Sequence, residues 1–142
     1  MRKIFPILLF AVLAFVACDN DDRRVEVNNT MRNFIEQKYD GAEILYAETE
    51  DRGMIDVDIT HDGIHKDVYF DKKNNWVYTS WDVMLDEVPA AAVEAVENKY
   101  PSYIIADVDY IERPSGISYK FDIEKGEWDR EVYVTPEGII ID

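Results

Sequence analysis

The sequence predicts an α+β fold, built as a tandem repeat of two units that each contain one helix and a four-stranded antiparallel sheet. Two helical segments, 27–39 and 88–100, end in the same Lys-Tyr pair. Each is followed by stretches in which apolar and polar residues alternate, the period of a half-buried strand. Residues that favour turns, glycine among them, separate these stretches.

The two halves of the chain resemble each other at a nearly constant spacing. The helical segments match at an offset of 61 residues, and residues 55–59 and 66–70 match later segments at an offset of 64. An insertion at 112–116, a predicted loop, explains the difference. Because order, residue type and spacing all agree, we expect one unit over 27–85 and a second over 86–142.

Each unit is expected to begin with an amphipathic helix. In the first, Asn28 or Asn29 can cap the N-terminus, and Gly41 can end the helix in a left-handed conformation. In the second, Pro89 suits the first turn, and Pro101 stops the helix. Apolar residues recur at helical spacing on one face of each helix, namely Met31, Phe34, Ile35 and Tyr39 in the first and Ala92, Ala95, Val96 and Tyr100 in the second.

Eight strands are expected, and one face of each sheet should pack beneath its helix. Ile55, Val57 and Ile59 point to one face, whereas the residues between them point to the other. A helix on one face of an antiparallel sheet is typical of α+β proteins. The predicted strands are 42–50, 53–60, 64–71, 75–81, 103–112, 116–124, 128–135 and 138–142.

The N-terminus has the pattern of a signal peptide over residues 1–17. Two basic residues precede an uncharged run, 4–16, which is shorter than the roughly 20 apolar residues of a transmembrane helix. The stretch 13–18 resembles the lipobox of bacterial lipoproteins, with Cys18 as the lipidated residue and Phe15 in the usual Leu position. An ordinary secretory signal followed by a chance cysteine is the alternative.

An acidic tether is expected over residues 18–26. Three aspartates follow within four residues of the cysteine. In some Gram-negative bacteria such a stretch resembles a signal for export to the cell surface, whereas in others an Asp at this place resembles a signal for retention in the inner membrane. We expect a lipid-anchored protein of the cell envelope, held in the outer membrane on its periplasmic or surface face, with the lipid as its only membrane contact.

Composition narrows the classes of partner. The chain has 15 basic and 30 acidic residues. Removal of 1–17 would take away two basic residues and leave a charge of −17. Such a charge repels nucleic acid, so no nucleic-acid partner is expected. Aromatic residues make up 13% of the chain, which argues against disorder. With one cysteine, no disulfide can form within the chain, so the core alone must stabilise the domain.

The strand and turn pattern of the second unit is similar to that of the PepSY-like family described as beta-lactamase-inhibitor-like. The resemblance rests on the Lys-Tyr end of the helix, on segments 119–123 and 131–134, and on a turn at Gly138. The first unit departs from it, because Lys73-Asn74-Asn75 stands where the second has this glycine. The resemblance implies an exported, non-enzymatic interaction module with tandem helix-plus-four-strand units. No inhibitory residue of the family can be matched to this chain.

No constellation in the sequence predicts catalysis, a cofactor or a metal centre. The single cysteine is assigned to lipidation, and His61 and His65 lie across a predicted turn rather than on one helix face. We interpret both histidines as solvated, since a zinc site needs three or four converging ligands. Asp56 and Asp58 share a strand face, as do Asp107 and Asp109. Weak calcium binding at such pairs is a minor hypothesis, because Ca²⁺ takes six to eight oxygens.

The candidate site is the sheet face opposite the helices. Tyr69 and Tyr133 occupy equivalent positions, each between two core-facing residues, so both should project to that face. They either stack across strands or anchor a partner, as interface tyrosines often do. The predicted partner-binding residues are Tyr69, Tyr133, Asp56, Asp58, Lys120 and Asp122.

Three classes of function remain open. The first is a non-enzymatic, protein-binding or inhibitor-like module in the envelope, with a protein partner there or in the extracellular space. The second is a lipoprotein that binds carbohydrate or an envelope polymer through exposed aromatic residues. The third is an enzyme, which would require a deep pocket with a perturbed carboxylate pair.

Overall fold

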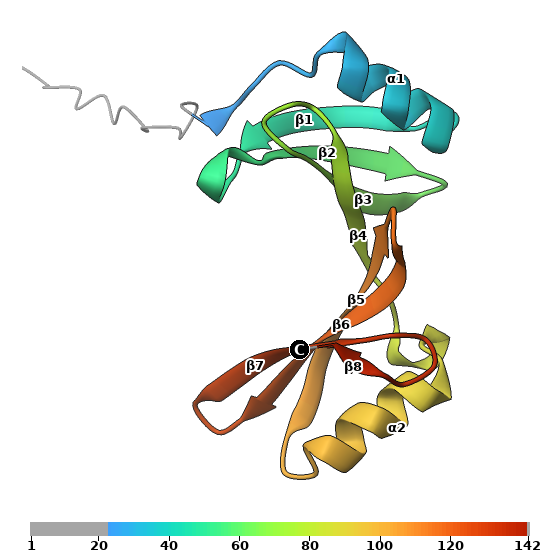
Figure 1. Cartoon of the computed structure of the whole chain (residues 1–142), viewed down its shortest axis with the longest axis vertical. Coiled ribbons are helices and arrows are strands. Elements are labelled where there is room, and N and C mark those ends of the chain that lie inside the picture. Colours follow the sequence, from blue (N-terminus) through green and yellow to red (C-terminus); the bar gives the residue numbers. More distant parts are fainter. Residues whose placement is uncertain (1–22, 142) are drawn as a thin grey trace, which may run out of the picture.

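The computed structural model describes residues 23–141, so the expected signal peptide and Cys18 lie outside the described residues (Figure 1). Within this range neither helix is long and apolar enough to cross a membrane. Each expected helix and strand is present, with its ends within two residues of the prediction. The elements are α1 (Asn29–Lys38), β1 (Glu43–Thr49), β2 (Ile55–His61), β3 (Ile64–Phe70), β4 (Trp76–Asp82), α2 (Ala90–Lys99), β5 (Ile104–Arg113), β6 (Gly116–Lys125), β7 (Trp128–Val134) and β8 (Ile140–Ile141).

The strands form one antiparallel sheet whose order follows the chain from β1 to β8. The two halves join where β4 pairs with β5, from Thr79 opposite Glu112 to Asp82 opposite Asp109. Figure 1 shows α1 at one end of the long axis and α2 near the other, with the strands between them. The sheet therefore bends with its helices on the outer side.

The two helices differ at their N-termini and end alike. Asn28 accepts a hydrogen bond from the backbone N–H of Met31 at 3.1 Å, which satisfies one of the free donors of the first turn. Pro89 is the N-cap of α2 and makes no side-chain cap there. A short 3-10 turn, Leu85–Glu87, leads into it and lies outside the predicted elements. Each helix ends at the tyrosine of its Lys-Tyr pair, whose N–H donates to the carbonyl four residues earlier.

The core of the first half lies between α1 and strands β1 to β3. Met31 and Ile35 of α1 are fully buried, as predicted for this helix face. Phe34 is only half-buried, because it lies at the margin, edge-on to Phe70 at 5.6 Å and stacked on Trp76 at 5.1 Å. The buried residues of the sheet beneath α1 are Ala47, Val57, Ile59, Val68 and Phe70.

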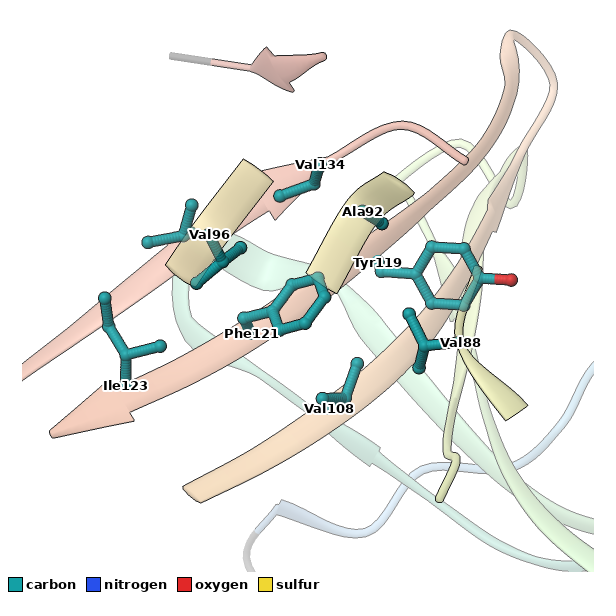
Figure 2. Close-up of a cluster of buried hydrophobic side chains, with 9 residues drawn as sticks. Val88, Ala92, Val96, Val108, Tyr119, Phe121, Ile123 and Val134 are labelled. Carbon is teal, nitrogen blue, oxygen red and sulfur yellow. The ribbon is translucent and has the colours of Figure 1, made fainter. Parts of the chain in front are cut away.

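The core of the second half is built on smaller helix residues. Figure 2 shows Ala92 and Val96 of α2 above Phe121, with Ile123 and Val134 alongside. All of these side chains are buried. The helix contributes little volume, so the aromatic ring from β6 fills the space that larger helix residues fill in the first half.

The hairpin between β5 and β6 corrects the predicted loop at 112–116. The strand β5 continues to Arg113 and β6 begins at Gly116, so only two residues form the turn. The side chain of Arg113 thus belongs to the sheet. At the other end of the chain, the segment expected as a tether reaches β1. Arg24 forms an isolated bridge with Glu48, and the Val25 N–H donates to the Ala47 carbonyl at 3.0 Å.

Candidate functional site

The sheet face that neither helix covers is called the helix-free face below. Side chains alternate along each strand, so the neighbours of the core residues point to it. Cross-strand pairing places Asp56 beside Tyr69 and Lys120 beside Tyr133. The helix-free face carries all six predicted site residues, which are Asp56, Asp58, Tyr69, Lys120, Asp122 and Tyr133.

Asp56 and Tyr69 form a buried polar pair in the first half. The hydroxyl of Tyr69 is hydrogen-bonded to the Asp56 carboxylate, while Asp56 Oδ1 is buried without a partner. Asp56 is 7% exposed. Its burial, together with repulsion by Asp67, raises its pKa to about 7. Burial and the nearby carboxylate likewise raise the pKa of Tyr69. This carboxyl can therefore change its charge near neutral pH.

An aromatic row continues from this pair towards the second half. The rings of Tyr69 and Tyr78 stack at 4.3 Å with an angle of 19° between them. The guanidinium of Arg113 lies 5.6 Å from the Tyr78 ring and 5.8 Å from the Tyr133 ring, within range of a cation–π interaction. Arg113 also donates to Ser118 Oγ at 2.7 Å. Its position is therefore held from two sides.

Lys120 organises the predicted residues of the second half. Its ammonium lies 2.6 Å from Asp109 and 3.4 Å from Asp122. Burial opposes its charge, but the carboxylates outweigh this effect and raise the pKa of Lys120. The positive charge of Lys120 is therefore already balanced by two carboxylates of the protein itself.

His65 is exposed, as its interpretation as a solvated residue requires, and it lies in an acidic cluster. The side chain of His61 is only 18% exposed, which corrects its interpretation as solvated. The Nε2 of His65 is 2.6 Å from Asp58 and 3.4 Å from Asp67, and the bond to Asp58 raises the pKa of the ring. Asp58, His65 and Asp67 each offer an atom within 4.8 Å of the others. The ring thus lies against two carboxylates.

A second acidic group lies next to the first across β4 and β5. Asp82, Asp107 and Asp109 also offer atoms within 4.8 Å of one another. The hydrogen bond between Asp82 and Asp109 raises the pKa of Asp82, because one of the two carboxyls must then hold a proton. Asp107 and Asp109 were expected to share a face, whereas Asp82 enters the group only through the pairing of β4 with β5.

The six predicted residues form two separate groups, one in each half. Tyr78 and Arg113 connect them, and neither was among the predicted site residues. The alternation of β4 contains the signal for Tyr78, since Thr79 pairs with Val68 of the core and Tyr78 pairs with Tyr69. No such signal exists for Arg113, whose segment resembles a loop.

The comparisons with known proteins bear on the fold and the family. A sequence model of the family described as "Putative beta-lactamase-inhibitor-like, PepSY-like" matches residues 53–142, more than half of the chain. The chain belongs to this family. The family is described as inhibitor-like and not as a family of enzymes. A search of curated proteins gave no match.

Solved structures share the fold of this PepSY-like protein. A BLIP-like protein from Bacteroides fragilis is 22% identical, with a TM-score of 0.72 over 87% of this chain and 89% of its own. A protein described as periplasmic from Bacteroides eggerthii is 20% identical, with a TM-score of 0.69 over 83% and 88%. At this level of identity the likeness establishes an antiparallel eight-stranded fold of the BLIP-like type.

Proposed function

We propose that this PepSY-like protein is a non-enzymatic, protein-binding or inhibitor-like module of the cell envelope, and that it binds its partner through the helix-free face. The observation that carries the proposal is the row formed by Tyr69, Tyr78, Arg113 and Tyr133, which crosses from one half of the sheet to the other. Tyrosine and arginine are the residues most enriched among interface anchors. Membership of an inhibitor-like family supports the same conclusion.

The proposal includes the finer organisation that the sequence predicts. The two halves, 27–85 and 86–142, would be copies of one unit. Cys18 would carry the lipid that holds the protein to the outer membrane after residues 1–17 are removed. The family membership and the solved structure described as periplasmic support an envelope location.

Capture of the partner by the full chain tests the binding face. Tagged full-length protein and its Tyr133→Ala and Arg113→Ala variants are cross-linked in intact cells, and the captured proteins are compared. Loss of an anchor should weaken binding by about 2 kcal/mol or more and remove the partner from the variants. Trp128→Ala is the matched control, because this aromatic residue is 76% exposed and lies off the helix-free face. Equal capture by all variants would contradict the proposal.

A carbohydrate or envelope polymer is the alternative ligand, because half-buried tyrosines can also stack on sugar rings. Affinity electrophoresis through gels that contain purified envelope polysaccharide distinguishes the two. The alternative, a carbohydrate ligand, is favoured if the polysaccharide retards the wild type but not Tyr133→Ala and if no protein is captured in cells.

Lipidation has its own test. Cys18→Ala should abolish metabolic labelling with a radioactive fatty acid and leave the unprocessed precursor. Unchanged labelling would show that the cysteine is not the lipidated residue. Cleavage without labelling in the wild type would instead indicate an ordinary secretory signal.

A further inference from the structure

The strand β4 stays paired with β5 for two residues after its pairing with β3 has ended, and an opening results. Its pairing with β3 runs from Trp76 to Ser80 and ends opposite Asp67. Its pairing with β5 then continues to Asp82. Residues 64–66 at the start of β3 therefore diverge from the end of β4. Figure 1 shows β4 crossing from the half that contains α1 to the half that contains α2.

Two adjoining cavities, of about 540 and 640 Å³, fill this opening. They share Ile64, Trp81 and Asp82 and thus form one groove. Their linings differ in character. The smaller cavity continues along the polar side chains Asp58, His65 and Asp67. The larger is mostly apolar, although Glu87 and Asp107 also line it, and it continues along Val83, Met84, Leu85, Ile105 and Val108.

The acidic end of the groove has more negative charge than the protein neutralises. Burial and repulsion by Asp58 raise the pKa of Asp67, to which Asp82 and Asp109 add further repulsion. Two cationic groups face these carboxylates: His65 is shared between Asp58 and Asp67, and Lys120 between Asp109 and Asp122. Asp82 has a carboxyl, not a cation, as its hydrogen-bond partner. A positive group that enters here would relieve repulsion between like charges that lie close together.

The apolar end exposes large side chains beside these charges. Met84 is 72% exposed, Leu85 45% and Ile64 43%. Single exposed apolar residues need no explanation. These three, however, lie along one groove whose other end is acidic. A ligand that matches both ends must present positive and apolar groups within a short distance.

From this complementarity we infer that the groove binds an extended segment of a partner protein that has arginine or lysine residues in one half and leucine-like residues in the other. The cationic side chains lie against Asp67 and Asp82, and the apolar ones against Leu85 and Ile64. An extended segment fits because the opening lies between two diverging strands. The inference deepens the proposed function, since it specifies the chemistry of the partner.

A synthetic nonapeptide with arginines in one half and leucines in the other, labelled with fluorescein, is the probe. Its anisotropy is measured with the full chain in nonionic detergent, and empty micelles provide the blank. We expect saturable binding that weakens with added salt. Asp67→Asn with Asp82→Asn should weaken it roughly tenfold or more, and Leu85→Ser should weaken it as well. Glu94→Gln with Glu97→Gln, on the exposed side of α2, is the matched control and should bind as the wild type does.

Three outcomes would overturn the inference. These are no saturable binding, equal affinity in the Asp67/Asp82 double variant, and equal affinity for an all-arginine nonapeptide. The last would mean that the apolar end takes no part. If the peptide does not bind but Tyr133→Ala still loses the captured partner, the groove inference is wrong and the proposed function stands. If the peptide binds to the groove but no captured partner depends on the tyrosines, the groove inference stands and the proposed binding face is wrong.

Discussion

Lys38 at the end of α1 and Glu112 on β5 form an ion pair 2.6 Å long that links the two halves of the molecule. The next residue, Tyr39, strengthens this link. Its hydroxyl lies 3.0 Å from the other oxygen of Glu112 and 2.8 Å from Thr79 Oγ1. The Lys-Tyr pair that ends the first helix is therefore both a helix terminus and a connection between the halves.

Glu112→Ala should destabilise the fold more than Lys38→Ala does. The ion pair is partly exposed, so removal of the lysine should cost within about 1 kcal/mol. Removal of the carboxylate also takes a partner from the tyrosine hydroxyl and should cost about 1–3 kcal/mol. Urea unfolding of both variants measures the difference, with Glu94→Ala on α2 as the surface control. Equal losses of unfolding free energy in the two variants would show that the hydrogen bond from the Tyr39 hydroxyl to Glu112 contributes nothing to stability.

Phe121→Ala should be the most damaging of the simple truncations in the second half. The ring is fully buried beneath the small residues of α2, which cannot move in to fill the space. Such cavities cost about 3–5 kcal/mol, a large part of the stability of a domain this size. The unfolding free energy from denaturant titration is the measurement. Trp128→Ala removes a larger but exposed ring and should change it little.

Stability should fall as the pH rises from about 4 to about 7. Folding raises the pKa of Asp56 to about 7, so the folded state holds this proton more tightly than the unfolded chain. Its contribution is complete below the unfolded pKa and is lost as the pH passes the folded value. The pKa of Asp67 and that of His65 are raised as well, so both act in the same direction.

Asp56→Asn isolates this contribution. The amide can still accept from Tyr69 and has no charge to bury. The melting temperature of the variant should exceed that of the wild type by about 5 °C at pH 8 and match it at pH 4.5. If the variant and the wild type have equal melting temperatures at both pH values, the pH dependence comes from groups other than Asp56.

Gly138→Ala should cost more than Gly63→Ala, although both glycines have a positive φ, +85° and +76°. A β-carbon at Gly138 would lie 2.5 Å from the carbonyl oxygen of Ala91 in α2, whereas nothing lies within 4 Å at Gly63. Backbone strain alone should cost about 1 kcal/mol or slightly more in each variant. Thermal or urea unfolding gives the loss of stability in each variant. The extra loss in Gly138→Ala measures the contact between the turn at Gly138 and α2. Equal losses would mean that this turn can move away freely.

Local patterns in the sequence predicted the elements, because their physical causes are local. The cap at Asn28 and the alternation around Val57 depend on neighbours within a few residues. The same alternation correctly placed Tyr69 and Tyr133 on the helix-free face. Whether they bind a partner is a separate matter and stays a prediction.

The arrangement of the site could not be predicted, because it depends on contacts between distant strands. Asp82 meets Asp109 only because β4 pairs with β5. Arg113 reaches the tyrosines only because a segment resembling a loop is a two-residue hairpin turn. Composition and periodicity contain no information on such pairings.

Strand neighbours in the sheet are also neighbours along the chain, and this has a consequence for the order of assembly. During synthesis, which begins at the N-terminus, each new hairpin can pair with the one before it, because no distant segment is needed. The exception is β4, whose second edge stays unpaired until 104–113 appears beyond α2. We expect pulsed hydrogen exchange during refolding to protect β2 and β3 first and residues 79–82 late. Simultaneous protection throughout would instead indicate one concerted step.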